Sequence, residues 1–175
     1  MFNERSDPVP RASRIPIADA AIDTELWMGG ADSLHGDLIV PDDLRDAWVV
    51  DLAGDMPAAH RAACACWLPR VFVDVEQVPH SYERLVALAT SVAACLTGAE
   101  RDDGWPHPSE PPRRLYVMCQ QGMNRSGLLA GLILRALGVP ADEAIAALMT
   151  RPGALTNQTY VRLIREWPNG MQHAE

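Results

Sequence analysis

The chain contains no lysine, because all 15 of its basic residues are arginine. A Walker A phosphate-binding loop requires a lysine, and Schiff-base enzymes use a lysine amine as nucleophile, so both classes are excluded. Arginine is also outnumbered, since 23 acidic residues bring the formal net charge to -8. Broad nucleic-acid or anionic-membrane surfaces need positive charge. The composition therefore argues against such partners, although a local positive pocket remains compatible with it.

Long apolar runs are missing as well. The N-terminal segment MFNERSDPVPRASRIP lacks the apolar stretch of a signal peptide, and no run approaches the roughly 20 residues needed to span a bilayer. We therefore expect a soluble, cytoplasmic protein that does not associate with membranes. Metal-ligand spacing is also absent from the four cysteines, so no metal site is expected. These cysteines are Cys64, Cys66, Cys95 and Cys119.

The length of 175 residues and the hydrophobic content of 48% suit one compact domain with a substantial core. Residues 1–17 carry three prolines among alternating charges, which predicts a flexible N-terminal arm. Residues 18–170 are predicted to form a single catalytic domain. Within it, the polar, proline-rich residues 98–113 are predicted to form an exposed loop.

Strand and helix patterns alternate along this domain. Strands are predicted at 25–30, 47–53, 67–75 and 115–119, and helices at about 57–66, 79–96, 125–137, 141–150 and 157–167. This alternation predicts an α/β fold with a central, largely parallel sheet flanked by helices. Ligands of such sheets bind beyond the carboxyl ends of the strands, which is where Cys119 falls.

The residues CQQGMNRS, 119–126, lie between a predicted strand and a predicted helix. Backbone N–H groups in such a loop are unpaired and the helix N-terminus is partially positive, so the curled loop can bind an anion. Gly122 permits a backbone conformation that a side chain would forbid. Arg125 begins the helix and can place its planar fork over a phosphate-like anion. These charges favour the thiolate form of Cys119, which suits it to attack phosphorus.

The segment from Cys119 to Gly127 resembles the signature loop of cysteine-dependent protein tyrosine phosphatases. Its Gly-x-x-Arg-Ser-Gly spacing and the chain length point to the small dual-specificity branch, and the resemblance extends over most of residues 24–167. It implies a dual-specificity phosphatase-like fold and catalytic roles for Cys119 and Arg125. The substrate-binding residues that it implies are Gln120, Gln121, Gly122, Met123, Asn124 and Arg125.

Further roles follow from the same resemblance. Asp74 stands where the family has its general acid, which protonates the leaving oxygen, and Glu76 is the second candidate for that role. Ser126 resembles the hydroxyl that hydrogen-bonds the thiolate, and it can also cap the helix. Asn157 resembles a polar residue near the family's pocket, although its position favours a helix N-cap.

Two features depart from the family pattern or lie outside it. The family usually has histidine before the nucleophile, where it helps to orient the loop, and this chain has Met118. Cys64 and Cys66 read as small buried residues, but some relatives protect the nucleophile through a disulfide with a second cysteine. The sequence leaves both of these readings of Cys64 and Cys66 open.

Together these residues predict a phosphoric monoester hydrolase with a phosphocysteine intermediate and no metal or organic cofactor. Its predicted substrates are phosphotyrosine or phosphoserine/threonine proteins, or small phosphate esters. One alternative is an RNA 5′-triphosphatase or polyphosphate phosphatase, because residues 124–127 resemble the Asn-Arg-Thr-Gly of that subgroup. Met118 suggests another alternative, a catalytically weak phosphate-binding module. Phosphoinositides fit less well, because residues 120–124 include no basic side chain. The sequence makes no prediction of oligomeric state.

Overall fold

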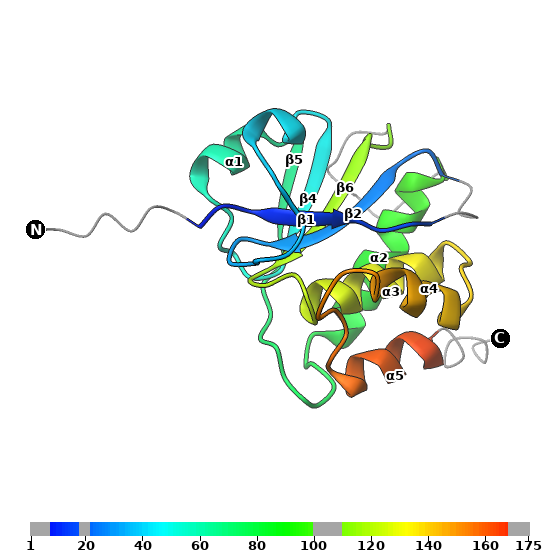
Figure 1. The fold of residues 1–175 in the computed structure, drawn as a ribbon. Coiled ribbons are helices and arrows are strands. Elements are labelled where there is room, and N and C mark those ends of the chain that lie inside the picture. The colour runs from blue at the N-terminus through cyan, green and yellow to red at the C-terminus, as the bar shows by residue number, and fades with distance from the viewer. Residues whose placement is uncertain (1–7, 18–21, 100–109, 168–175) are drawn as a thin grey trace, which may run out of the picture.

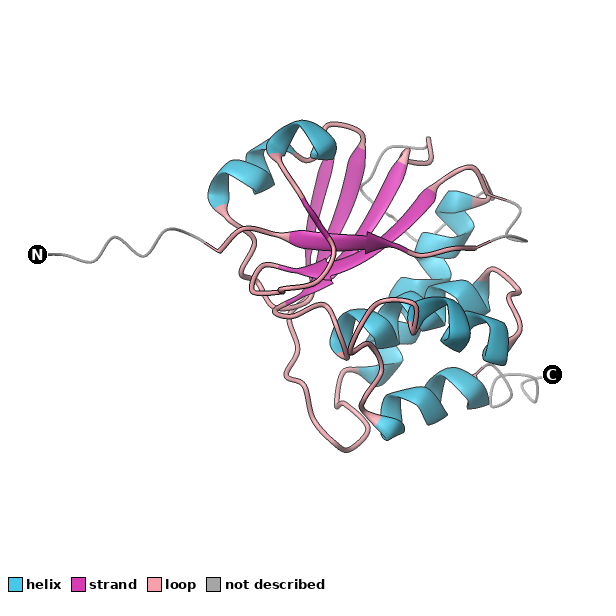
Figure 2. Cartoon of the chain, viewed as in Figure 1, coloured by secondary structure: helices cyan, strands magenta, loops and turns pink. Residues whose placement is uncertain are grey.

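The computed structural model describes residues 8–17, 22–99 and 110–167. Its elements in chain order are β1 (Arg11–Arg14), β2 (Glu25–Gly30), β3 (Asp37–Leu38), the 3₁₀ helix η1 (Pro41–Leu44), β4 (Ala47–Asp51), α1 (Ala58–Ala63), β5 (Cys66–Pro69), α2 (Tyr82–Leu96), β6 (Arg114–Cys119), α3 (Arg125–Ala136), α4 (Ala141–Leu148) and α5 (Gln158–Glu166). Figures 1 and 2 show the strands as one sheet, with α2 to α5 gathered on one side and α1 on the other.

The six strands have the order β3-β1-β2-β6-β4-β5. β2, β6, β4 and β5 run parallel to one another, whereas β1 is antiparallel to both β2 and β3. α1 joins β4 to β5 and α2 joins β5 to β6, so these parallel strands are connected through helices. The predicted α/β class, with a central and largely parallel sheet flanked by helices, is therefore confirmed.

β1 corrects the prediction that residues 1–17 form a flexible arm. Residues 11–14 pair with both β2 and β3, and Ala12 is completely buried. The segment Arg-Ala-Ser-Arg lacks the alternating apolar pattern of a strand, so its structure depends on pairing with distant residues. Residues 1–7 lie outside the described part of the chain, as do residues 100–109 of the predicted proline-rich loop.

β5 is shorter than the predicted strand at 67–75, because it ends at Pro69. The following segment still lies beside the end of β4. The backbone N–H of Arg70 donates to the carbonyl of Asp51 at 2.9 Å, and that of Phe72 donates to the carbonyl of Leu52 at 3.3 Å. These two hydrogen bonds hold residues 70–75 beside the carboxyl ends of the parallel strands, and Asp74 therefore lies at that end of the sheet.

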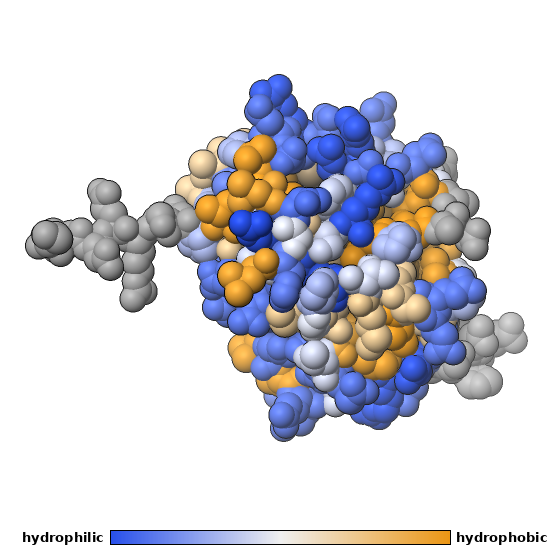
Figure 3. Space-filling view, in the orientation of Figure 1, coloured by the Kyte–Doolittle hydropathy of each residue, from blue (hydrophilic) through white to orange (hydrophobic). Residues whose placement is uncertain are grey.

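The two faces of the sheet bury separate apolar clusters. One cluster joins alternate residues of the central strands to α2, α3, α4 and α5, and α3 is buried throughout from Ser126 to Leu134. The second is smaller and includes Leu44 of η1, with Ala63 of α1 packed against it. Burial on nearly all sides makes α3 a rigid support for the loop that precedes it. On the face shown in Figure 3, apolar residues reach the surface in separate areas among hydrophilic ones.

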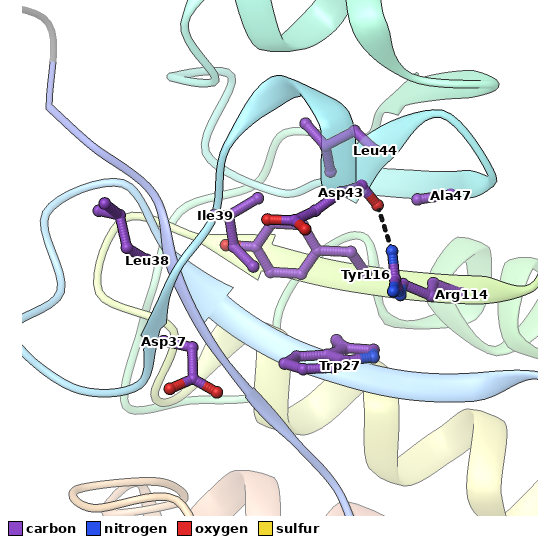
Figure 4. Close-up of a pocket in the computed structure, with 9 residues that line it drawn as sticks. All are labelled: Trp27, Asp37, Leu38, Ile39, Asp43, Leu44, Ala47, Arg114 and Tyr116. Carbon is purple, nitrogen blue, oxygen red and sulfur yellow. Dashed lines mark hydrogen bonds between the residues drawn. The ribbon is translucent and has the colours of Figure 1, made fainter.

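A mainly apolar pocket lies on the face of the sheet opposite α2 to α5 (Figure 4). Trp27 and Tyr116, which are paired across β2 and β6, form part of its wall. Arg114 lies at one side and donates to the backbone carbonyl of Asp43 at 2.8 Å. Arg114 begins β6 and Cys119 ends it, so this pocket lies toward the amino ends of the parallel strands, whereas the predicted nucleophile lies at their carboxyl ends.

Within the described ranges, no helix has both the length and the apolar character needed to cross a membrane. The same part of the chain contains no group of three or more His, Cys, Asp or Glu side chains arranged to hold a metal ion.

Candidate active site

Cys119 is the last residue of β6, at the carboxyl edge of the parallel strands. Gly30 of β2 is its pairing partner on one side, and Asp51 of β4 pairs with the preceding Met118 on the other. Only 3% of Cys119 is exposed. The nucleophile predicted from the sequence therefore lies buried between the ends of β2 and β4.

Gly122 shapes the loop that follows Cys119. Its φ is +69°, and an added Cβ would lie 2.2 Å from the carbonyl carbon of Gly29. The loop therefore turns back over the end of β2, at a separation that excludes any side chain at Gly122. Gly30 meets the loop from below, since a Cβ there would lie 2.4 Å from the carbonyl oxygen of Gln120. Gly29 and Gly30, at the end of β2, thus form one close contact with the loop that contains Gly122.

The N-terminus of α3 opens onto the same loop. Asn124 is the N-cap residue, but its side chain makes no capping hydrogen bond to the helix. Its Oδ1 instead accepts from the backbone N–H of Asn157 at 2.9 Å, and its Nδ2 donates to Thr156 at 3.1 Å. First-turn N–H groups that no side chain caps are available to an anion, which the helix dipole also favours.

Ser126 and Arg125 lie side by side in the first turn of α3, and Ser126 contacts Cys119. The Ser126 hydroxyl is buried and lies 3.4 Å from Cys119 Sγ. Nη1 of Arg125 donates to the carbonyl of Phe72 at 3.0 Å and to that of Leu52 at 3.5 Å. These two carbonyls follow β5 and β4, so they hold the guanidinium over the edge of the sheet. The planar group is thereby oriented before any ligand binds.

Asp74 lies two residues beyond the carbonyl that holds Arg125, and α5 supports it. Asn157 Nδ2 donates to the carbonyl of Val75 at 2.8 Å and lies 3.5 Å from Asp74 Oδ1. The hydroxyl of Tyr160 accepts from the backbone N–H of Val75 at 3.2 Å. Burial, with a further contribution from Asp74, raises the pKa of Tyr160 to about 12, so this phenol stays neutral. Helix α5 therefore fixes the backbone that carries Asp74.

Asn157 performs the N-cap role that its position favours. Its Oδ1 accepts from the backbone N–H groups of Thr159 at 3.1 Å and Tyr160 at 3.4 Å. Because the same side chain contacts the Asp74 segment, the cap of α5 also connects that segment to Asn124. The two acid candidates differ in their contacts with α5. Asn157 lies near the Asp74 carboxyl group, whereas Glu76 is bound through its backbone carbonyl, which accepts from the Thr159 hydroxyl at 2.5 Å.

The remaining loop residues are divided between the interior and the surface. Gln120 and Gln121 are exposed, and Gln120 Nε2 donates to Asp32 at 3.0 Å. Met123 is half-buried beside Gly153, where an added Cβ would lie 2.9 Å from the methionine methyl group. The side chains of these three residues thus point away from the centre of the loop. The backbone of residues 119–126 is left to line the candidate anion site, which we call the cup.

Arg151 binds two backbone carbonyls of the loop, and no sequence motif marks it for this role. Its side chain is buried, with Nε donating to the carbonyl of Gly122 at 2.7 Å and Nη2 to that of Gln121 at 3.2 Å. It also donates to Ser33 at 2.6 Å and Ser13 at 2.9 Å. Because Arg151 binds the carbonyls of Gln121 and Gly122 on one side of the loop, the backbone N–H groups of the loop can point to the other side, toward an anion.

The burial of Arg151 lowers its pKa, although a guanidinium remains protonated in proteins. Its positive charge interacts favourably with Cys119, and so it reinforces the field at the base of the cup. A signal for this role was weak in the sequence, because one arginine in a turn after a helix is usually a surface residue. Ser13 and Ser33, its partners, lie more than a hundred residues away.

Replacing Arg151 with lysine is expected to lower the affinity for orthovanadate about tenfold, equivalent to about 1.4 kcal/mol. Lysine keeps the charge but cannot reach two loop carbonyls and two hydroxyls with one planar group. Isothermal titration with orthovanadate measures the effect, and thermal unfolding reports stability. Arg135→Lys is the matched control, because Arg135 holds the carbonyls of Val139 and Trp167 at the other end of α3. An equal loss of vanadate affinity in both variants would contradict the positioning role.

Asp55 adds a carboxyl beside the cup. It lies in the loop after β4, and its Oδ1 is buried without a hydrogen-bond partner in the structure. Burial raises the pKa of Asp55, and the negative charges of Asp51 and Asp32 raise it further, whereas Arg125 opposes the shift. Asp51 is itself fully buried, and its carboxylate accepts from the backbone N–H groups of Ala53, Gly54 and Met56, in the loop after β4, at 2.8 to 3.2 Å.

A disulfide between Cys119 and either Cys64 or Cys66 is not compatible with this sheet. Cys64 packs against the apolar cluster on the opposite face from Cys119. Cys66 pairs with Trp48, which pairs with Leu115, so it lies two strands away and four residues back, a separation of more than about 10 Å. Disulfides need Cα atoms within about 7 Å. These positions exclude the disulfide, and both cysteines are half-buried rather than enclosed in the core.

No family model matches the sequence, and no curated protein gives a match. Solved structures do match. Tk-PTP in its active form is 16% identical, with a TM-score of 0.55, over 89% of this chain and 95% of that one. The Yvh1 phosphatase domain from Chaetomium thermophilum is 15% identical, with a TM-score of 0.54, over 94% and 99%. PTPMT1 in complex with PI(5)P is 15% identical, with a TM-score of 0.52, over 89% and 92%.

These identities are low, so the likeness concerns the fold. It covers most of this chain and nearly all of each matched structure. The chain therefore has the fold of the cysteine-dependent tyrosine and dual-specificity phosphatases, as the resemblance of residues 119–127 implied.

Proposed function

We propose that the protein is a cysteine-dependent phosphatase that hydrolyses phosphate monoesters through a phosphocysteine intermediate. The observation that carries the proposal is that Cys119 lies 3.4 Å from Ser126 in the uncapped first turn of α3, while the neighbouring Arg125 is held at the same edge of the sheet by the Phe72 carbonyl. A phosphate dianion is the ligand whose charge and three equatorial oxygens suit such a cup. The fold of the chain agrees with this chemistry.

In the first step, the Cys119 sulfur attacks phosphorus and the bond between phosphorus and the leaving oxygen breaks. The electron pair departs with that oxygen, to which Asp74 gives its proton. Arg125 and the loop N–H groups bind the equatorial oxygens as their charge redistributes. In the second step, water attacks the phosphorus, Asp74 takes the proton, and the sulfur leaves as thiolate. Ser126 then stabilises that thiolate by donating a hydrogen bond from its hydroxyl.

The proposed substrates are phosphotyrosine or phosphoserine/threonine proteins and small phosphate esters. Every group used in the two steps is a side chain or backbone amide of this chain, so the scheme requires no cofactor. The direct experiment measures phosphate release from 4-nitrophenyl phosphate, together with acid trapping of the phosphorylated protein. A protein that binds orthovanadate but neither releases phosphate nor forms a phosphoenzyme would instead be a phosphate-binding module.

Replacing Asp74 with asparagine is expected to slow hydrolysis of an alkyl phosphate by about 100-fold or more. The effect on 4-nitrophenyl phosphate should be smaller, because nitrophenolate leaves readily without a proton. The measurement is kcat on both esters across a range of pH. Glu76→Gln is the matched control, and it should leave the ratio of the two rates unchanged. A uniform loss across leaving groups in Asp74→Asn would show that Asp74 is not the acid.

A further inference from the structure

Carboxylates surround the proposed phosphate cup on several sides. Asp32 follows β2, and its backbone N–H donates to the carbonyl of Gln120 at 2.9 Å. Asp55 follows β4 and interacts electrostatically with both Asp32 and Arg125. Asp74 lies beyond β5, in the segment whose Phe72 carbonyl accepts from Arg125. Three strand ends therefore each bring a carboxyl side chain to the edge of the sheet beside the proposed phosphate site.

The positive charges at the cup are already committed. Arg125 is the basic residue of the loop, and positions 120–124 contribute amide, thioether and glycine groups. Arg151 is 1% exposed and donates to protein oxygens at five distances between 2.6 and 3.2 Å, so it cannot also bind a second phosphate. The cup is thus suited to one phosphate group, with acidic surroundings beyond it.

A groove leads from the loop toward the N-terminus of α5. It encloses about 630 Å³ and is lined by Asp74, Val75, Glu76, Asn124, Thr156, Asn157, Gln158 and Thr159. None of these eight lining residues is basic, and two carry carboxylates. The amide oxygens of Asn124 and Asn157 already accept from backbone N–H groups, so Asp74 and Glu76 supply the carboxyl groups that a ligand in the groove can meet. Such a groove favours a cationic side chain that carries several N–H donors.

Apolar side chains are exposed between the acidic ones. Val71 is 62% exposed and Val73 is 74% exposed, in the segment that precedes Asp74. Leu34 is 89% exposed, two residues after Asp32. Exposed aliphatic groups beside carboxylates would contact the aliphatic parts of a polypeptide. They offer no comparable contact to an inositol ring or to a polyphosphate chain.

We infer that this site, if it is the phosphatase proposed above, selects a phosphorylated protein segment in which arginine or lysine residues lie close to the phosphorylated side chain. A basic residue on either side of the phosphate would approach the carboxylates of Asp32 or Glu76, while Asp74 carries the proton for the leaving oxygen. An additional anion there would be repelled by the same groups. Polyanionic substrates, such as phosphoinositides and triphosphate-ended RNA, are disfavoured by this arrangement.

Two phosphotyrosine peptides that differ only in the charge of their flanking residues test the inference. One carries arginine and the other glutamate at the positions two residues before and after the phosphotyrosine. We expect kcat/KM for the arginine peptide to be about tenfold higher at low salt, and the ratio to fall toward one at 0.5 M NaCl. Equal values at low salt, or a preference for the glutamate peptide, would overturn the inference.

Variants locate the effect. Asp32→Asn keeps an oxygen that can accept from Gln120, and it should reduce the ratio between the two peptides. Asp46→Asn removes the same charge from an exposed residue just before β4, at the far edge of the sheet, and should leave the ratio unchanged. An equal effect of both variants would mean that net charge, not the rim, sets the preference.

A soluble short-chain phosphoinositide completes the panel. Its kcat/KM should lie below that of the arginine peptide, and a higher value would contradict the proposed selectivity. The failure of the underlying function has a separate signature. In that case 4-nitrophenyl phosphate and both peptides would all be left intact, whereas a failure of selectivity alone leaves all of them hydrolysed.

Discussion

Replacing Cys119 with serine is expected to abolish hydrolysis of 4-nitrophenyl phosphate, with a loss of about 10,000-fold or more. A serine hydroxyl is far less acidic than a thiol, so it stays protonated and attacks phosphorus poorly. Both side chains are small, and the buried position 3.4 Å from Ser126 accommodates either. Thermal unfolding should therefore show little change, while orthovanadate binding by the loop and Arg125 persists in weakened form. Turnover close to that of the unmodified protein would end the phosphocysteine mechanism.

Alkylation provides a second measurement on the same residue. Iodoacetamide near pH 7 should modify Cys119 before Cys64, and vanadate should protect Cys119. Burial raises the pKa of Cys64 to about 12, so its thiol carries no appreciable thiolate at this pH. Mass spectrometry of digested protein identifies which cysteine reacts. Preferential modification of Cys64 would contradict the assignment of Cys119 as the activated thiol.

Replacing Arg125 with lysine is expected to lower kcat by about 100- to 1,000-fold. The guanidinium can contact two phosphate oxygens while Nη1 remains bonded to the Phe72 carbonyl, whereas an ammonium group offers a single charged point. Steady-state kinetics on 4-nitrophenyl phosphate measure the loss.

Arg70→Lys is a suitable control for this substitution. Arg70 is exposed and donates to the neighbouring carbonyl of Pro69, in the segment that leads to Asp74. Its replacement should change kcat less than twofold. A similar kcat for Arg125→Lys and the unmodified protein would show that Arg125 serves to hold the Phe72 and Leu52 carbonyls and does not bind the reacting phosphate.

Most elements of the fold could be predicted from local patterns. The continuous apolar run 47–53 predicted a buried strand, and β4 occupies Ala47–Asp51. Helical spacing predicted the helix that became α2, because an amphipathic face repeats every 3.6 residues wherever it packs. The apolar run after Arg125 predicted α3, which is buried on nearly all sides. β1 escaped prediction since its four residues have no such repeat, and the end of β5 was misplaced because apolar residues continue beyond Pro69 without forming a strand.

The site divides in the same way. The loop 119–126 could be recognised because its chemistry is encoded in contiguous residues: a thiol, a permissive glycine, an arginine and a hydroxyl at set spacing. Arg151 and Asp55 could not, since their importance comes from neighbours that are remote in sequence, such as Gly122, Ser13 and Arg125. Nothing local marks an arginine as the residue that will be buried behind a loop.

What the sequence by itself determined is the local chemistry: the absence of lysine, the anion-binding loop, and the alternation of strands and helices that makes a parallel sheet. Tertiary structure decided which groups surround that loop. It placed β1 in the sheet, buried Arg151 against two loop carbonyls, attached the Asp74 segment to α5, and brought Asp32 and Asp55 to the rim. The physical reason is that periodicity and spacing describe neighbours along the chain, whereas charge and burial at a site are summed over all neighbours in space.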